Sequence, residues 1–212
     1  LGIPKEKITI RRINILKPDS ENVFKKEIGT DFILSAGRLD EMKGFKYSIQ
    51  AFNNFHQQYP DVHYVIVGTG ILEQELKELV SSLKLENFVH FVGHVKNSQV
   101  LEFAKGAVFS ILSSIEMPNK DKEGLPTCFV ESMSLGTPCI GTNYSGTPEL
   151  IDHEENGMLT AEKDVEDIAD KMKKLYDMVK HDENKIYWAC KNKVNEIFDN
   201  QKNIALLLNH LK

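Results

Sequence analysis

The sequence predicts an α/β fold in which a parallel sheet is covered by helices on both faces. Two observations carry this prediction. Short apolar runs, bounded by Gly, Pro or polar turns, recur along the chain. Between these runs lie amphipathic stretches whose apolar residues recur at helical spacing. Strand–helix alternation of this kind is typical of a Rossmann-like parallel sheet.

The expected elements follow one another in a regular order. The apolar runs predicted as buried strands are Phe32–Ala36, Val62–Val67, Phe88–Val92, Ala107–Leu112 and Pro138–Gly141. The helical stripes consist of Phe45, Ile49, Phe52 and Phe55, then Leu72, Leu76, Leu79 and Leu83, then Val165, Ile168, Met172, Leu175 and Val179. Parallel sheets bind ligands outside the carboxyl ends of their strands, where the strand order reverses. We therefore expect the chemistry directly after the strands.

The last part of the chain has a different character. From Lys163 to Lys212 it is expected to be almost wholly helical, and it ends in an apolar cluster within Ile204–Leu211. A helix that is so apolar needs a partner surface. Either it packs on this domain or it reaches a part of the protein that this chain lacks.

Composition excludes several classes of protein. With 41% hydrophobic and 27% charged residues, the chain matches an ordinary globular domain. A net charge of −5 gives no electrostatic reason to expect nucleic acid as a partner. The three cysteines form no zinc-like pair, and no apolar run approaches the roughly 20 residues of a membrane span. Because the chain starts at Leu1 in what resembles a mid-protein segment, we expect a fragment.

The segment from Gly37 to Gly44 directly follows the first predicted strand. It places Arg38 and Lys43 between two turn-permitting glycines at the mouth of the sheet. Arg offers a planar fork for phosphate oxygens, and Lys offers a compact point charge. Taken alone, the segment fits a phosphate site and an ordinary solvated basic turn equally well.

The segment from Glu123 to Glu131 follows the fourth predicted strand, and a helix is expected to start near Thr127 as its N-cap. The amides of Gly124, Leu125 and Thr127 would then face an anion near the helix N-terminus, with Pro126 stiffening the approach. Glu131 would point into the same crevice, where its two oxygens suit the cis-diol of a ribose. The alternatives are a helix-dipole role for Glu131 and a plain charged loop for Glu123.

Together these segments resemble glycosyltransferase family 4, a family of retaining enzymes with two Rossmann-like domains (the GT-B fold). Its Gly-Arg…Lys-Gly segment is matched by Gly37, Arg38, Lys43 and Gly44. Its Glu-Gly-x-Pro-x-x-x-x-Glu motif is matched in full by Glu123, Gly124, Pro126 and Glu131. Further matches are Phe91–Gly93, Ser145–Glu149 and Asn156–Leu159. The extended loop before Glu123 is most similar to members that build exopolysaccharides such as colanic acid.

The resemblance implies a role for each matched residue. Arg38 and Lys43 would hold the diphosphate of a nucleotide sugar, and Glu123 would lie near hydroxyls of the donor sugar; these three are the expected catalytic residues. Glu131 would bind the ribose. The other expected donor-binding residues are Gly37, Gly93, His94 and Val95, the last three around the base, with Gly124, Leu125, Pro126 and Thr127 facing the sugar and phosphates.

The resemblance also implies how the whole enzyme is organised. Residues 1–212 would form the nucleotide-sugar-binding domain, with C-terminal helices from about residue 163. The N-terminal acceptor domain, absent from this chain, would be its partner, and the acceptor a glycan or lipid-linked sugar. Transfer would need no metal and no cofactor. We expect the domain in the cytoplasm, where nucleotide sugars are made; a lipid-linked acceptor would bring the enzyme to the inner face of a membrane.

Two alternative functions remain open at this point. A sugar-nucleotide epimerase of the same two-domain shape would share the cleft, although the complete Glu-x7-Glu motif favours transfer. A non-catalytic nucleotide-sugar-binding module would have no need for two cations and two carboxylates at one cleft. A dinucleotide site at Gly68-Thr69-Gly70 is disfavoured, because Glu73 stands where that fingerprint needs its third glycine.

Overall fold

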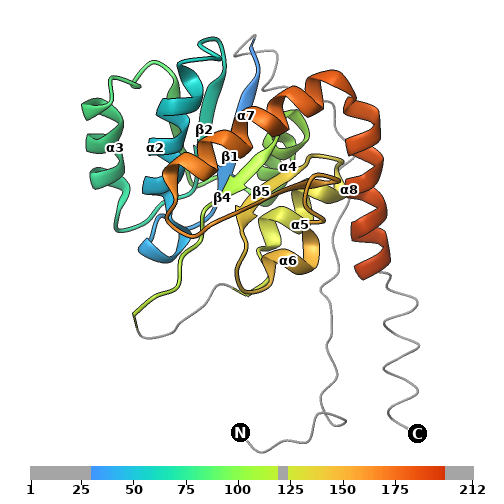
Figure 1. Ribbon diagram of the computed structural model, residues 1–212. Coiled ribbons are helices and arrows are strands. Elements are labelled where there is room, and N and C mark those ends of the chain that lie inside the picture. Colours follow the sequence, from blue (N-terminus) through green and yellow to red (C-terminus); the bar gives the residue numbers. More distant parts are fainter. Residues whose placement is uncertain (1–29, 119–123, 199–212) are drawn as a thin grey trace, which may run out of the picture.

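A computed structural model describes residues 30–118 and 124–198 of the chain, and it contains one six-stranded sheet flanked by helices (Figure 1). The strands are β1 (Phe32–Ala36), β2 (His63–Val67), β3 (Val89–Gly93), β4 (Ser110–Leu112), β5 (Cys139–Thr142) and β6 (Gly157–Thr160). The helices are α2 (Phe45–His56), α3 (Glu73–Ser82), α4 (Asn97–Gly106), α5 (Thr127–Ser134), α6 (Thr147–Leu150), α7 (Val165–His181) and α8 (Glu183–Ile197), with a short 3-10 helix, η2 (Glu41–Lys43), before α2.

The sheet confirms the predicted Rossmann-like topology. Its strand order is β3-β2-β1-β4-β5-β6, and every pair in the ladder is parallel. The chain therefore runs outward from β1 to β3, returns to the middle and runs outward again from β4 to β6. The order reverses between β1 and β4, which is the position at which open α/β sheets bind their ligands.

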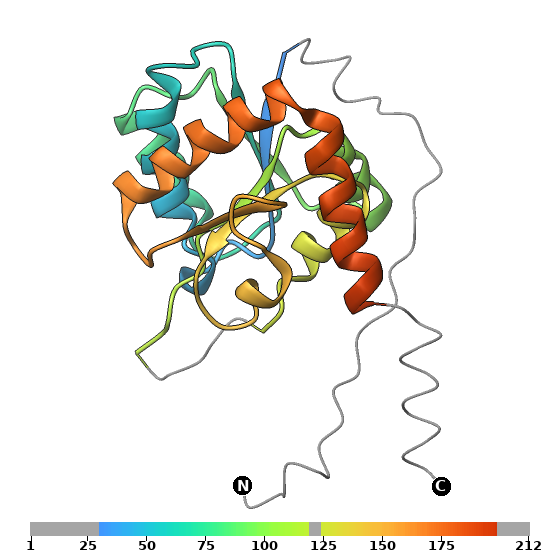
Figure 2. The same ribbon diagram turned by 45° about the vertical axis from the view of Figure 1, so that its right-hand side comes forward.

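Helices cover both faces of the sheet, as the sequence predicts. Helices α2, α3 and α7 lie on one face, while α4 and α5 lie on the other with α8 packed along α5 (Figures 1 and 2). Successive side chains of β1 pack on opposite faces of the sheet. Ile33 lies in the cluster that contains Phe52 of α2, and Leu34 lies in the cluster that contains Phe103 of α4. Both side chains are almost fully buried, which fixes β1 as the centre of the molecule.

The structure differs from the sequence prediction at several elements. Neither α4 nor β6 was expected, and the run starting at Ala107 enters the sheet as β4 only from Ser110. Backbone bonds from Val108 N to Phe32 O (2.8 Å) and from Leu34 N to Phe109 O (3.1 Å) still tie the start of the run to β1. Helix α4 ends at Gly106, so residues 107–109 lie between the helix and β4, and composition alone does not show where the strand begins.

The predicted C-terminal helical region is confirmed as far as residue 198. It is divided into α7 and α8 at Asp182, which ends one helix and begins the next. The carboxylate of Asp164 accepts from Asp167 N (3.0 Å) at the start of α7, and that of Asp182 accepts from Lys185 N (3.0 Å) at the start of α8. The apolar cluster within Ile204–Leu211 lies outside the described residues. Across the described ranges, no helix has the length and apolar character needed to cross a membrane.

Candidate functional site

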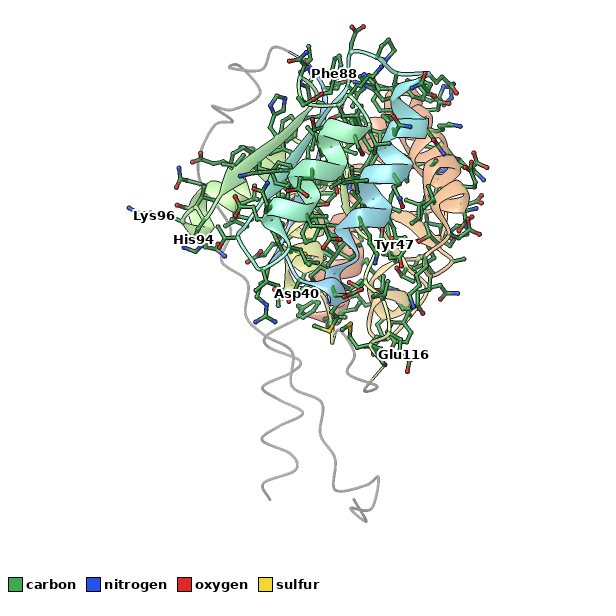
Figure 3. All side chains as sticks on the ribbon, turned by 90° about the vertical axis from the view of Figure 1, so that its left-hand side faces the viewer. Asp40, Tyr47, Phe88, His94, Lys96 and Glu116 are labelled. Carbon is green, nitrogen blue, oxygen red and sulfur yellow. The ribbon has the colours of Figure 1, made fainter. Side chains whose placement is uncertain are left out.

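A crevice of about 490 Å³ lies where β1, β2 and β3 end, facing the start of α5. Its volume is that of a small-molecule site. Of the residues singled out from the sequence, six line it: Gly37, Arg38, His94, Val95, Thr127 and Glu131. Figure 3 shows Asp40 and His94 toward this end of the molecule, with Phe88 at the opposite end. Parallel topology thus brings together residues that are more than ninety positions apart in the chain.

The backbone around Arg38 is fixed on both sides. Gly37 N donates to Val67 O and Leu39 N to Thr69 O, both at 3.0 Å, so the segment after β1 continues alongside the segment after β2. The Arg38 side chain itself is 71% exposed, and its Nε donates to Oδ2 of Asp40 at 2.6 Å. The guanidinium is therefore held on a rigid base at the rim of the crevice.

Lys43 is positioned by a glycine turn. Gly44 adopts φ of 64°, and a Cβ at this position would collide with the carbonyl oxygen of Ser113. Only glycine lets η2 approach the end of β4 so closely. The Lys43 side chain runs past Gly37, with Cε 3.9 Å from where a Cβ on Gly37 would lie. Lys43 thus lies beside the floor of the crevice, although it does not line it.

The start of α5 corrects one prediction. Thr127 was expected to be the N-cap, but its backbone is already helical and Pro126, with φ of −65° and ψ of 108°, takes that position. No side chain caps the helix, because proline offers no hydrogen-bonding group beyond its carbonyl. Oxygen O of Pro126 accepts from Phe129 N at 3.1 Å and from Val130 N at 3.3 Å. The helix N-terminus therefore faces the crevice without a side-chain acceptor of its own.

Glu131 lies on the second turn of α5 and is half-buried in the crevice wall. Its Oε1 accepts from Nδ2 of Asn97, at the start of α4, over 2.9 Å. Asn97 also lines the crevice. Neither Asn97 nor Asp40 is among the candidates predicted from the sequence. Both stand close to predicted candidates, Asn97 two positions after Val95 and Asp40 two after Arg38, and that proximity is the signal that was missed.

The remaining candidates that the structure describes lie outside the lining of this crevice. Gly124 and Leu125 pack against Gly146 before α6, since a Cβ on Gly146 would lie 2.9 Å from Gly124 O and 3.0 Å from Leu125 Cα. Gly93 ends β3, and its carbonyl accepts from Gly68 N at 2.8 Å. Glu123 falls outside the described residues.

A second hollow, of about 610 Å³, lies on the other side of η2 near Tyr47 and Glu116 (Figure 3). Its carboxylates are engaged locally: Glu162 accepts from Glu116 N at 3.1 Å and pairs with Lys163 at 3.0 Å. Three carboxylates line this hollow, those of Glu41, Glu116 and Glu162, against the one ammonium of Lys163, so the first crevice suits an anionic ligand better. Among residues 30–118 and 124–198, no group of three or more His, Cys, Asp or Glu side chains is placed to hold a metal ion.

Comparison with known proteins assigns the chain to a family. The family described as glycosyl transferases group 1 matches residues 17–191. The chain belongs to this family. Among its relatives, the amylovoran biosynthesis glycosyltransferase AmsK of Erwinia amylovora is 33% identical over 171 residues, which cover 80% of this chain and 42% of that protein. The putative colanic acid biosynthesis glycosyltransferase WcaL of Escherichia coli K12 is 30% identical over 173 residues, covering 81% and 43%.

Solved structures of other glycosyltransferases share the fold. The Anabaena protein HepE, solved in complex with UDP and glucose, superposes with a TM-score of 0.73 at 22% identity, covering 90% of this chain and 51% of that one. Staphylococcus aureus TarM gives a TM-score of 0.75 at 16% identity, covering 93% and 37%. This group 1 chain therefore has the fold of one Rossmann-like half of a GT-B protein. The chain spans half or less of the length of curated relatives such as these.

Proposed function

We propose that this chain is the donor-binding half of a retaining glycosyltransferase, which holds a nucleoside-diphosphate sugar for metal-independent transfer to an acceptor in polysaccharide or glycolipid synthesis. The observation that carries the proposal is the crevice at the switch point of the sheet, which joins the cation of Arg38, the carboxylate of Glu131 and the start of α5. A nucleotide sugar presents a diphosphate, which suits Arg38 and the start of α5, and a ribose diol, which suits Glu131. Its flat base would lie against the segment that follows β3, where His94 and Val95 line the crevice.

The diphosphate would lie between Arg38 and the start of α5. Nε of Arg38 is bonded to Asp40, so the two outer nitrogens of its planar fork would contact phosphate oxygens. Lys43, beside Gly37, would add a second positive charge, and the helix dipole of α5 would add a third favourable interaction. As the bond to the sugar breaks, the leaving diphosphate gains negative charge, and these fixed groups would stabilise it in place of a metal ion.

The nucleoside would lie on the other side of the crevice. Glu131 would accept from the ribose hydroxyls, and His94 and Val95 of the crevice lining would border the base, together with Gly93 at the end of β3. Glu123 and the backbone of Gly124–Thr127 would contact the donor sugar. The acceptor would come from the part of the enzyme that lies outside this chain. We place the enzyme in the cytoplasm, with the inner face of a membrane as its location if the acceptor is lipid-linked.

Titration calorimetry of this chain with UDP, GDP and ADP, each with and without EDTA, tests the proposal. HepE is solved with UDP, and a mycobacterial relative is named as GDP-mannose-dependent, so both bases belong in the panel. We expect one nucleotide to bind equally well with and without EDTA. Replacing Arg38 by Ala should weaken the binding of that nucleoside diphosphate by about 1.5–3 kcal/mol and leave the binding of the bare nucleoside nearly unchanged.

Two outcomes would contradict the proposal. If Arg38→Ala weakens the binding of the nucleoside diphosphate and of the bare nucleoside equally, Arg38 does not bind the phosphates. Loss of binding in EDTA would remove the metal-independent mechanism. Assay of the full-length protein separates the alternatives: sugar transfer supports a transferase, recovery of an isomerised sugar nucleotide supports an epimerase, and binding without turnover supports a non-catalytic module.

A further inference from the structure

The contact between Asn97 and Glu131 joins two helices across the crevice. Asn97 is the first residue of α4, Glu131 is the fifth residue of α5, and these helices lie next to each other on one face of the sheet (Figure 1). Their side chains meet at 2.9 Å, from Nδ2 to Oε1. A carboxylate only accepts hydrogen bonds, so the amide nitrogen of Asn97 is the atom that must face it. The direction of the contact is therefore set by chemistry.

The local structure of α4 does not require this side chain of Asn97. The first turn of α4 is closed by Gln99, whose Oε1 accepts from Lys96 N at 3.2 Å, and by the backbone bond from Val100 N to Lys96 O at 3.1 Å. Asn97 directs its amide across to α5 and lines the crevice with Glu131. The Asn97 side chain thus links α4 to α5 and does not cap its own helix.

The contact restricts how Glu131 can present its carboxylate. A glutamate side chain has several rotatable bonds, and fixing it on binding costs conformational entropy. With Oε1 already held by Asn97, Oε2 and the remaining lone pair of Oε1 keep one orientation toward the crevice. A carboxylate held in this way is organised to accept from two neighbouring hydroxyls before the ligand arrives.

We propose that Asn97 is a positioning residue for Glu131 and that it sets the preference of this site for ribose over 2′-deoxyribose nucleotides. The inference rests on the proposed function, because it assigns the ribose to Glu131. Removing the amide would leave the carboxylate mobile. Each hydrogen bond from a ribose hydroxyl to Glu131 would then contribute less to the binding free energy. Affinity for ribonucleotides would then fall, while affinity for deoxynucleotides, which lack one of the two hydroxyl partners, would fall less.

Calorimetric titration of the full chain with UDP, GDP and ADP and with their 2′-deoxy counterparts measures this preference directly. In the unmodified chain we expect the ribonucleotide that binds to do so on the order of tenfold more tightly than its deoxy counterpart. In Asn97→Ala the ratio should fall to roughly two- to threefold. Ser98→Ala is the matched control, since this neighbour on the same turn is exposed and does not line the crevice; it should keep the full ratio.

A double variant shows whether Asn97 acts through Glu131. In the Glu131→Ala background, adding Asn97→Ala should leave the ratio of ribose to deoxyribose affinities unchanged. If Asn97→Ala lowers the ratio further in that background, Asn97 contacts the ribose itself and the positioning role is wrong. An unchanged ratio in the single variant Asn97→Ala, or equal weakening of both nucleotides, also overturns it. If the unmodified chain binds none of the three ribonucleotides, the proposed function fails first and this inference fails with it.

Discussion

The two ends of the parallel sheet differ in how they use ionisable side chains. At the C-terminal end, Arg38 and Glu131 line an open crevice, each held by one polar neighbour. At the N-terminal end, three histidines pack among aromatic rings: His63 Nδ1 lies 2.7 Å from His90 Nε2, and the ring centroid of His56 lies 4.1 Å from that of Phe88. The crevice thus presents charged groups to solvent, whereas the three histidines are partly or fully buried.

Burial explains the behaviour of the enclosed end. It lowers the pKa of His56, His63 and His90 below the usual value of 6.5, and for His63 the charge of His90 adds to the effect. Perturbed pKa values often mark functional sites. In this protein these three histidines lie at the end of the sheet away from the crevice, so their shifts indicate packing. Geometry at the strand ends is the better guide to the candidate ligand site.

The largest expected effect comes from the turn that positions Lys43. Gly44→Ala should lower the free energy of unfolding by about 2–4 kcal/mol, because it adds a Cβ to a left-handed residue and drives it into the Ser113 carbonyl. Urea unfolding followed by circular dichroism measures the change. Gly124→Ala is the control, since a Cβ there meets nothing within 4 Å. Equal stability of the two variants would show that η2 does not need this close approach.

A crossed pair of variants tests the division between the two ends. Glu131→Ala should weaken nucleoside diphosphate binding by ~1–3 kcal/mol through loss of charged hydrogen bonds, and change the free energy of unfolding by less than about 0.5 kcal/mol. His90→Gln, at the other end, should leave nucleotide affinity unchanged. Calorimetry measures the nucleotide affinity of each variant, and urea unfolding measures its free energy of unfolding. A binding defect in His90→Gln would break the comparison.

The pH dependence of stability should come from the enclosed end. The pKa values of His56, His63 and His90 are lower in the folded state than in the unfolded chain, so near and below pH 6.5 the unfolded state binds more protons. The stabilisation by neutral histidine is thus complete above the unfolded value and is lost as the pH falls through it toward the folded values. We expect the melting temperature to fall between about pH 7.5 and about pH 5.

The double variant His63→Gln, His90→Gln tests the source of that loss. It removes two of the three groups and should flatten the acid side of the stability profile, measured as melting temperature against pH. The opposing charge of Asp61, which raises the pKa of His56 and His63, remains in this variant. An unchanged acid profile would place the pH dependence elsewhere in the chain.

The smallest expected effect lies in an exposed turn that follows β2. Ile71, in the turn between β2 and α3, is 89% exposed. Ile71→Ser should change the free energy of unfolding by less than about 0.5 kcal/mol, because no packed surface is lost. A larger loss of stability, measured in the same urea experiment as Gly44→Ala, would show that this turn takes part in packing.

Much of the site was predictable because it lies in loops that follow apolar runs. Gly37, Arg38 and His94 could be assigned to one end of the sheet, since parallel strands finish at the same end. The cap of α5 was predicted one residue late, because threonine is a favoured N-cap residue and proline is not, whereas Pro126 takes the position here. Strand β6, only four residues long, was missed because its assignment depends on pairing with β5 and on the burial of Met158.

The sequence by itself determined the kinds of element and their order, because hydrophobic periodicity is a local property that each segment carries. It also determined that the cation of Arg38 and the carboxylate of Glu131 follow strands of one sheet. Only the tertiary structure decided which side chains meet, such as Asn97 with Glu131 and His63 with His90. The reason is that a periodic pattern specifies the buried face of an element, whereas distances between elements depend on how helices and strands pack together.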